Sequence, residues 1–380
     1  MTLYTFYEFF SGGGMARAGL GAQWNCLFAN DLSEKKAHTY ARNWGSDHLT
    51  VGDIFGLSSA NLPGQVDLAW GSFPCQDLSL AGAGAGLGGK RSGAFWGYWE
   101  LIRSLNREGR KPRMVMLENV YGTLTSHDGK DFAAIAQALA EENYQFGAMV
   151  INAVHFIPQS RPRLFILGID AEMRIPDSVH GWTATPAWHP DAVIRAHNRL
   201  SKRQQALWRW WTPPMPNVAP GTIEDLLEHE PAGVSWHAPE ETAKLLSSMS
   251  DVNRRKVMLA QAGGDTRVGT VYRRTREGVV RAEVRFDGIS GCLRTPSGGS
   301  SRQTILIVQG ERIRSRLLSP REAARLMGLP DDYKLPERYN DAYHLAGDGV
   351  AVPVVSHIAR TLLDPIMNAQ DAAGKNRAAA

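Results

Sequence analysis

Cysteine is scarce in this sequence, and its scarcity argues against two classes of small protein. The 380 residues contain three cysteines, Cys26, Cys75 and Cys292, with no close pair among them. Disulfide frameworks and Cys-rich zinc sites both need closely spaced cysteines, so no metal site is expected. The sequence also has no run of about 18 apolar residues, the length that a membrane-spanning helix requires. Because the first residues lack the pattern of a secretory signal, we expect a cytoplasmic protein without a membrane partner.

Net charge is also small, but the charges are unevenly distributed along the chain. The 42 Lys and Arg residues against 38 Asp and Glu give a formal net charge of +4. Residues 254–321 hold 15 basic and 5 acidic residues, a net of +10, which leaves the remainder at −6. This asymmetry predicts a polyanionic partner for one region, although an Arg-rich solvated surface produces the same pattern.

The first 170 residues have the pattern of an α/β domain. Short apolar runs such as MVMLEN and LFILGI alternate with helical segments such as DFAAIAQALAEENY. Strands that alternate with helices in this way predict βαβ units and a mostly parallel sheet. The length predicts roughly two domains, each able to bury its own core.

The pattern changes after about residue 170 and becomes regular again near residue 319. We interpret the tryptophans of this middle region as the core of a second, smaller domain: Trp182, Trp188, Trp208, Trp210, Trp211 and Trp236. Ser319, Pro320 and Glu322 then have the pattern of a helix N-cap, a first-turn proline and a capping-box acid. A last helix is expected in VPVVSHIARTLLDPI, before a small polar tail that should fray.

A glycine-rich segment lies where the first strand should turn into the first helix. Glycines in FFSGGG, residues 9–14, allow the backbone to approach a ligand closely in front of a helix N-terminus. Asp31 and Asp53 follow the second and third expected strands, where carboxylates accept hydrogen bonds from a ribose or an adenine. A plain tight turn explains the glycines alone, but the spaced acids favour an adenosine-bearing cofactor.

Reactive side chains follow several of the expected strands. Cys75 comes directly after a buried strand and Pro74, and the Gly/Ala-rich loop behind it is typical of a mobile lid. Glu118 ends another strand, and Arg161 and Arg163 precede a third. Because ligands bind at the carboxyl edge of open α/β sheets, these residues predict a site with a thiol, a carboxylate and guanidinium groups.

The segments FSGGG, PCQ, ENV and QSRPR, in this order and spacing, resemble the motifs of bacterial and phage DNA (cytosine-5)-methyltransferases. RLLSPREAARLMGLPDDY and GDGVAVPVV resemble the last two motifs of that family. The resemblance implies a Rossmann-like S-adenosylmethionine-dependent methyltransferase sheet with helices on both faces, plus a smaller, mostly β target-recognition domain. The implied boundaries are residues 1–172 and 316–366 for the catalytic domain, 173–315 for target recognition and 367–380 for a flexible tail.

The family mechanism assigns a role to each reactive side chain. By resemblance, Cys75 adds as a thiolate to C6 of a cytosine flipped out of duplex DNA, and a methyl group passes to C5. Glu118 would contact the N3 edge and the exocyclic amine, and Arg163 the O2 side of the base, with Arg161 beside it as a second anchor. The implied catalytic residues are therefore Cys75, Glu118, Arg161 and Arg163.

The resemblance also implies two binding surfaces. S-adenosyl-L-methionine would contact Phe10, Ser11, Gly12, Gly13, Gly14, Met15, Asp31, Leu32, Asp53, Ile54, Pro74, Asp348, Gly349 and Val350. Duplex DNA would contact Gln76, Ser79, Lys90, Arg91, Arg273, Arg274, Arg294, Gly298, Gly299, Arg302 and Gln303, with a β-hairpin turning at Glu277-Gly278 and its arginines on phosphates.

Three positions depart from the family pattern. Met15 stands where glycine is usual, and Leu32 where an aromatic residue often stacks on adenine. Asp348 stands where Asn is common; its carboxylate either favours the cationic cofactor over the neutral product or makes the same hydrogen bonds as Asn.

Three other functions share part of this pattern. A tRNA cytosine-5 methyltransferase uses the same catalytic motifs, although the long variable region favours duplex DNA. A non-catalytic DNA-binding relative should lack Cys75 or Glu118, and a nicotinamide-dependent dehydrogenase has no use for either residue. We therefore expect a monomeric cytoplasmic enzyme of bacterial or phage type. The sequence leaves open whether a cognate restriction endonuclease exists, and such a partner would be functional rather than physical.

Overall fold

The computed structural model describes residues 3–74, 93–276, 278–295 and 302–378. The chain forms two compact units. Unit 1 contains residues 1–151, 162–217 and 350–380, and unit 2 contains residues 152–161 and 218–349.

Unit 1 is built on a seven-stranded sheet with the strand order β3-β2-β1-β4-β5-β7-β6. Its strands are β1 (Tyr4–Phe9), β2 (Trp24–Asp31), β3 (Leu49–Val51), β4 (Leu68–Gly71), β5 (Met114–Val120), β6 (Tyr144–Asn152) and β7 (Pro162–Asp170). The pairs among β1 to β5 are parallel, whereas β7 runs antiparallel to β5. The α/β fold class expected from the sequence is therefore confirmed.

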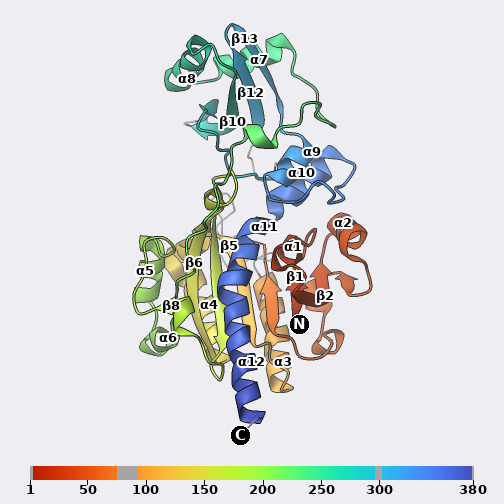
Figure 1. Ribbon diagram of the computed structural model, residues 1–380, viewed down its shortest axis with the longest axis vertical. Helices are drawn as coiled ribbons and strands as arrows, with labels where there is room; N and C mark the ends of the chain where they lie inside the picture. The colour runs from red at the N-terminus through yellow and green to blue at the C-terminus, as the bar shows by residue number, and fades with distance from the viewer. Residues whose placement is uncertain (1–2, 75–92, 277, 296–301, 379–380) are drawn as a thin grey trace. The chain divides into compact units, whose positions relative to one another are not determined.

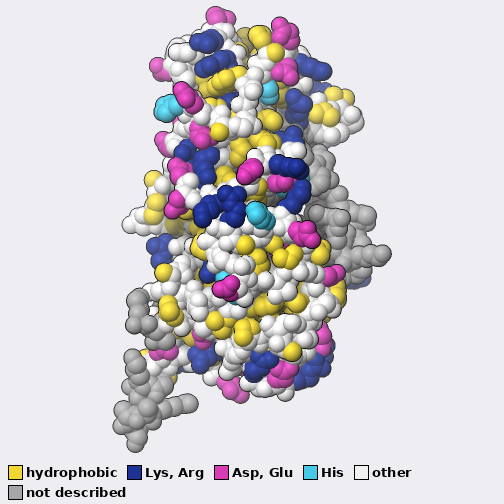
Figure 2. Space-filling view, turned by 90° about the vertical axis from the view of Figure 1, so that its right-hand side faces the viewer, with side chains coloured by type: hydrophobic (Ala, Val, Ile, Leu, Met, Phe, Trp, Pro, Cys, Tyr) yellow, Lys and Arg dark blue, Asp and Glu magenta, His cyan; other side chains and the backbone are white. Residues whose placement is uncertain are grey.

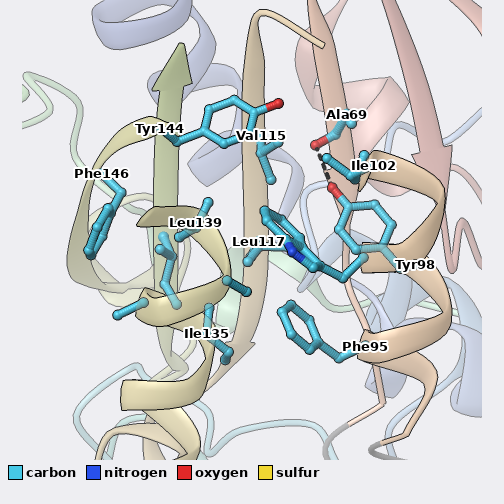
Figure 3. Close-up of a cluster of buried hydrophobic side chains, with 14 of the residues drawn as sticks. Ala69, Phe95, Tyr98, Ile102, Val115, Leu117, Ile135, Leu139, Tyr144 and Phe146 are labelled. Atoms are coloured by element: carbon cyan, nitrogen blue, oxygen red, sulfur yellow. Dashed lines mark hydrogen bonds between the residues drawn. The ribbon is translucent and has the colours of Figure 1, made fainter. Parts of the chain in front are cut away.

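Helices cover both faces of this sheet (Figure 1). The helices of unit 1 are α1 (Met15–Leu20), α2 (Glu34–Trp44), α3 (Ala94–Arg107), α4 (Lys130–Glu141), α5 (Asp191–Asn198), α6 (Lys202–Leu207), α11 (Val352–Ile358) and α12 (Asp364–Ala378). On one face, Phe95 and Tyr98 of α3 and Ile135 of α4 pack with Val115 and Leu117 of β5 (Figure 3). Both faces are apolar because successive residues of each buried strand point to opposite sides.

The last two helices pack on the opposite face, beside the first strand. The Tyr4 hydroxyl donates a hydrogen bond to Asn368 Oδ1 (2.8 Å), and the Trp24 indole donates one to Asp364 Oδ1 (2.9 Å). Part of the predicted flexible tail is therefore helical, because Ile366 and Met367 have an apolar surface to bury against. The helical stretch Tyr339–Ala373 has the length and composition of a membrane span, but 61% of its most apolar part is buried inside the protein.

The tryptophan-rich segment packs on the large sheet and not in the smaller unit. The main-chain carbonyl of Trp188 accepts from Val150 N of β6 (2.8 Å), and the Trp211 indole donates to Leu167 O of β7 (3.2 Å). Short strands β8 (His180–Gly181) and β9 (Trp210–Trp211) pair within this segment. The expected tryptophan core of a second domain is thus wrong: residues 173–217 belong to unit 1, Trp182 is 92% exposed, and only Trp236 lies in unit 2.

Unit 2 contains a four-stranded antiparallel sheet with the order β11-β10-β12-β13. Its elements are α7 (Pro239–Ser247), α8 (Asp251–Ala262), β10 (Arg267–Arg276), β11 (Val279–Arg285), β12 (Thr304–Gln309), β13 (Arg312–Leu317), α9 (Pro320–Arg325) and α10 (Tyr339–Asp348). The expected cap of α9 is confirmed, because Ser319 Oγ accepts from Glu322 N and the Glu322 carboxylate accepts from Ser319 N. Residues 316–349, expected in the catalytic domain, belong to unit 2.

Helices α7 and α8 cover one face of the unit 2 sheet. Leu245 of α7 and Val257 of α8 form a core with Val271, Val284 and Leu306 of the strands. Alternate residues point to the other face, and the cross-strand pairs Tyr272–Glu283 and Arg274–Arg281 lie there. Figure 2 shows Lys and Arg side chains among apolar ones on the side of the molecule that it presents.

Candidate active site

The ends of the central strands meet at one edge of the unit 1 sheet. Gly71 at the end of β4 pairs with Phe9 on one side and with Leu117 on the other. The glycine loop, the segment that leads to Pro74, and Glu118 therefore leave the sheet at the same level. The strand register thus produces the convergence expected for a ligand-binding edge.

Glu118 and Arg163 form an ion pair at this edge. The antiparallel register pairs Val120 with Arg163, which brings the two side chains together. Arg163 Nε lies 3.3 Å from Glu118 Oε1, and the side chains are 17% and 9% exposed. Both groups are largely shielded from water. Together they offer a planar polar ligand a hydrogen-bond acceptor, the carboxylate, and a donor, the guanidinium.

Asn119 connects this strand to the segment before the predicted nucleophile. Its amide donates to the main-chain oxygen of Phe73 (3.3 Å), and its Oδ1 accepts from Val120 N (2.8 Å) and from the Thr123 hydroxyl (3.2 Å). Phe73 immediately precedes Pro74, which is partly buried. Asn119 was not predicted as a site residue, although its place directly after Glu118 in the ENV segment was the available signal. Cys75, Gln76, Ser79, Lys90, Arg91 and the predicted lid lie outside the described residues.

The glycine loop adopts backbone conformations that explain its composition. Phe10, Gly12 and Gly14 have φ values of 57°, 55° and 77°. A Cβ atom at Gly14 would lie 2.4 Å from Trp44 Nε1, so Gly14 is required for space as well as for φ. The Ser11 hydroxyl is buried and has no hydrogen-bond partner among the described residues. An unsatisfied buried hydroxyl beside an open glycine fits a polar group of a bound ligand.

The two predicted acids differ in how firmly they are held. Asp31 is 8% exposed, and its carboxylate accepts from Gly12 N and Ser33 N, each at 2.8 Å. These bonds connect the glycine loop to the end of β2 and leave further lone pairs for a ligand. Asp53 is exposed and accepts from Phe55 N (3.1 Å).

The remaining predicted cofactor residues include both exposed and buried positions. Leu32, the expected weak stacking partner, is 71% exposed. Met15, Ile54 and Val350 are buried, Gly13 is also buried, Gly349 is partly buried, and Asp348 is exposed. Asp31, Ser11 and the glycines of unit 1 thus have the donors, acceptors and space that an adenosine-bearing ligand needs.

A buried polar cluster behind the glycine loop was not anticipated from the sequence. The Trp44 indole donates to Gly13 O (3.0 Å), and the Arg17 guanidinium lies over the Trp44 ring at 5.1 Å. Arg17 also donates to the Tyr40 hydroxyl (3.1 Å) and contacts His48. Burial raises the pKa of Glu8, whose Oε1 accepts from Arg17 N, to about 8. No sequence motif marks these residues, because residues at helical spacing indicate only a helix that packs against the core.

Arg161 lies in unit 2, and its hydrogen bonds there are not those expected of a second base anchor. It is 2% exposed, and its guanidinium donates to the main-chain oxygens of Leu293 (3.0 Å), Gly347 (3.0 Å) and Gly349 (2.6 Å). A guanidinium in this environment uses its Nη1 and Nη2 groups to satisfy carbonyl groups. The sequence could not distinguish the two arginines of QSRPR, because only strand register aims Arg163 at Glu118.

The predicted DNA-contacting residues of unit 2 are exposed in part. The hairpin is confirmed, since Arg276 pairs with Val279 across the turn. Arg273, Arg274 and Arg294 are exposed. Arg302 is partly buried and lies over the Tyr339 ring at 5.5 Å.

Gln303 does not fit its expected role as a reader of base edges. It is 3% exposed, and its side-chain amide donates to Val271 O (2.9 Å). Gln303 is buried directly before β12, and its side-chain amide satisfies a backbone carbonyl group there. Gly298, Gly299 and the predicted turn residue Glu277 lie outside the described residues.

Solved structures with the same fold are methyltransferases. The chain aligns over 96% of its length with 99% of an Entamoeba histolytica methyltransferase, EhMeth, at a TM-score of 0.64 and 14% identity. It aligns with a prophage-encoded DNA modification methyltransferase of E. coli at a TM-score of 0.58 and 17% identity, covering 96% of this chain and 99% of that one. At such identities the likeness establishes the methyltransferase fold.

The family is established by sequence. The model of the C-5 cytosine-specific DNA methylase family matches residues 4–364, so the chain belongs to that family. The enzyme class is DNA (cytosine-5-)-methyltransferase, as the motif resemblance implied. Curated relatives include M.HpaII of Haemophilus parainfluenzae, 26% identical over 97% of this chain and 91% of that protein, and M.HhaI of Haemophilus parahaemolyticus, 24% identical over 94% of each. Both are named Type II methyltransferases.

Proposed function

We propose that this enzyme methylates C5 of a cytosine within a specific sequence of duplex DNA, using S-adenosylmethionine as the methyl donor. The observation that carries the proposal is the Glu118–Arg163 ion pair at the strand ends, with Asn119 holding the carbonyl of Phe73. The nucleophile assigned by resemblance, Cys75, follows two residues after Phe73. This arrangement supports a thiol, a carboxylate and a guanidinium acting on one planar base.

The chemistry begins at Cys75. Its thiolate adds to C6 of the flipped cytosine, and the electron pair of the C5–C6 double bond moves toward C5. Glu118 contacts the N3 edge and the exocyclic amine and shares a proton there, so negative charge does not accumulate on the ring. Arg163 holds both the O2 side of the base and the Glu118 carboxylate. After methylation, loss of the C5 proton restores the double bond as the Cys75 sulfur leaves C6.

The cofactor residues are proposed on the loop geometry. Bound S-adenosylmethionine would supply an electrophilic methyl group. Asp31, already oriented by Gly12 N and Ser33 N, would accept from the ribose hydroxyls, and Asp53 from the adenine amine. The buried Ser11 hydroxyl would donate to a polar group of the same ligand. The last family motif implies cofactor contacts for Asp348, Gly349 and Val350 as well.

DNA recognition is proposed for unit 2, with Arg274 and Arg281 on the phosphate backbone. These two residues are exposed and lie directly opposite each other on neighbouring strands. Like charges in this position repel each other, and a bound phosphate would relieve the repulsion. We further propose that the enzyme is a cytoplasmic monomer of a bacterial or phage Type II system.

Covalent trapping tests the proposal. A duplex containing 5-fluorocytosine at the target position should form an adduct that resists denaturation, because fluorine blocks the loss of the C5 substituent. Cys75→Ala should form no adduct. The assignment of Cys75 as the nucleophile would be refuted by an adduct that still forms in Cys75→Ala. It would also be refuted if the wild type formed no adduct on a duplex containing the sequence that it methylates. Bisulfite sequencing of DNA and tRNA from expressing cells identifies which nucleic acid is methylated, and conversion-resistant cytosines confined to tRNA would contradict duplex DNA.

A further inference from the structure

The QSRPR segment contains two arginines with different surroundings, and the first of them organises unit 2. Arg161 is almost fully buried and makes hydrogen bonds to two separate segments of the chain. Its Nη1 donates to Leu293 O (3.0 Å) and to the Cys292 sulfur (3.3 Å). Its Nη2 donates to Gly347 O (3.0 Å) and Gly349 O (2.6 Å). One guanidinium thus joins the 292–293 segment to the 347–349 turn.

Gln159 also makes a hydrogen bond to the 292–293 segment, to the N–H group of Leu293 rather than to its carbonyl. Its Oε1 accepts from Leu293 N (3.1 Å), while its Nε2 donates to Leu326 O (2.6 Å). Both backbone polar groups of Leu293 are therefore satisfied by side chains two residues apart in QSRPR. Gln159 is fully buried and Leu293 is 1% exposed, so these bonds are shielded from water.

The two joined segments also touch directly. A Cβ atom on Gly347 would lie 3.3 Å from the carbonyl carbon of Arg294 and 3.4 Å from Thr295 N. Gly347 lies in the last turn of α10, so the absence of a side chain there serves the close approach of the 294–295 backbone. The two segments are therefore closely packed at this point.

We propose that Arg161, together with Gln159, is a latch that sets the 292–295 segment and the 347–349 turn in one arrangement. This inference rests on the proposed function, in which Arg294 lies on the DNA side and the Asp348–Val350 turn on the cofactor side. Arg161 is a positioning residue that contacts neither base nor cofactor. Because the two segments are fixed together, cofactor binding and DNA binding are coupled through it, and the coupling is reciprocal.

The matched pair Arg161→Met and Arg163→Met distinguishes this latch from a second base anchor. S-adenosylmethionine binding to the full chain is measured by calorimetry without DNA. Arg161→Met should weaken binding by about tenfold or more, since several charge-assisted hydrogen bonds are lost. Arg163→Met should bind the cofactor as the wild type does, although methylation is lost. Wild-type cofactor affinity in Arg161→Met would overturn the proposal.

Gly347→Ala provides a variant that keeps every latch hydrogen bond. Gly347 does not have the left-handed φ that only glycine adopts easily, so the protein should fold, but the 294–295 backbone must move by a few tenths of an ångström. DNA affinity is measured with and without saturating S-adenosylhomocysteine. The factor between the two affinities should fall several-fold in Gly347→Ala. Coupling would be contradicted if the ratio of the two DNA affinities were unchanged in Gly347→Ala, or if the cofactor product did not alter the DNA affinity of the wild type. An enzyme that never methylates DNA would instead refute the proposed function.

Discussion

The two units handle charge in opposite ways. In unit 1 two carboxylates at strand ends, Asp31 and Glu118, are buried, and the backbone orients the first and a single guanidinium the second. In unit 2 the arginines of the antiparallel sheet are mostly exposed, and two of them, Arg274 and Arg281, lie directly opposite each other. Under the proposed function, buried and oriented charge would serve the chemistry at one base, whereas exposed charge would serve binding along a polymer.

Two arginines of unit 2 depart from this difference. Arg316 is buried in an ion pair with Glu322, and Arg161 is a buried cation whose hydrogen-bond partners include three carbonyl oxygens. Unit 2 therefore also contains oriented charge, and its purpose is the internal order of the unit. The comparison predicts large effects on chemistry from unit 1 and graded effects on affinity from unit 2.

Glu118→Gln should show the largest effect. The amide retains the shape of the side chain but cannot share a proton with the base, so kcat should fall by about 10²–10⁴. Steady-state methylation of a cognate duplex measures the loss, and cofactor affinity, which should not change, is the control. A variant within about fivefold of wild type would mean that the buried carboxylate of unit 1 has no role in the chemistry.

Glu8→Gln tests the cost of burying a carboxylate in unit 1. Burial raises the pKa of Glu8 from an ordinary 4.5 to about 8. Between these values the unfolded chain releases a proton that the folded chain retains, so wild-type stability falls as pH rises from about 4.5 to 8. The neutral amide avoids this loss, and Glu8→Gln should gain on wild type by a few kcal/mol over that window.

Chemical denaturation at pH 5 and pH 8 measures this difference. Glu141→Gln, at an exposed position of α4, is the matched control and should show no such trend. If the difference between Glu8→Gln and wild type were the same at both pH values, Glu8 would be ionised in the folded protein.

Arg274→Gln with Arg281→Gln tests whether the face of the unit 2 sheet that bears these two arginines contacts the phosphates. Loss of two phosphate contacts should reduce the slope of log K against log salt by about 1.8. The control is Arg254→Gln with Arg255→Gln on α8, where both arginines are exposed on the opposite side of the sheet. If the control pair reduced the slope and the strand pair did not, the DNA would contact the helical face.

Trp44→Phe should show the smallest effect. An aromatic ring, although a smaller one, is retained, but the indole N–H that donates to Gly13 O is lost. One neutral hydrogen bond contributes about 1 kcal/mol, so the Kd for S-adenosylmethionine should rise about fivefold while kcat is unchanged. Trp182→Phe, at a 92% exposed position, is the control. A fall in kcat without a change in Kd would show that Trp44 acts elsewhere than on the glycine loop.

Several features of both units were predictable because their signals are local. The glycine loop, the Ser319 cap and the hairpin around Gly278 each depend on residues within a few positions of one another. The motif order identified the family, and the family match over residues 4–364 confirms it. The assignments of Cys75 and the DNA-contacting residues remain predictions.

Packing partners far apart in sequence were not predictable. A tryptophan side chain can be buried on the large sheet as well as in the core of a separate domain. Composition alone therefore could not locate the tryptophans after residue 170. Gln303 and Arg161 are polar residues in motif-like segments, but each satisfies backbone carbonyls that the fold brings near. The helical end of the chain depends on Tyr4 and Trp24, more than 300 positions away.

The sequence by itself determined which chemical groups this enzyme has and in which order they occur, because motifs are local and their residue types are dictated by reactivity. Only the tertiary structure decided which of those groups face one another. The antiparallel pairing of β5 with β7 aims Arg163 at Glu118, while Arg161 lies among carbonyl oxygens. Strand register and burial are properties of the whole fold, so two arginines that look equivalent in QSRPR have different tasks.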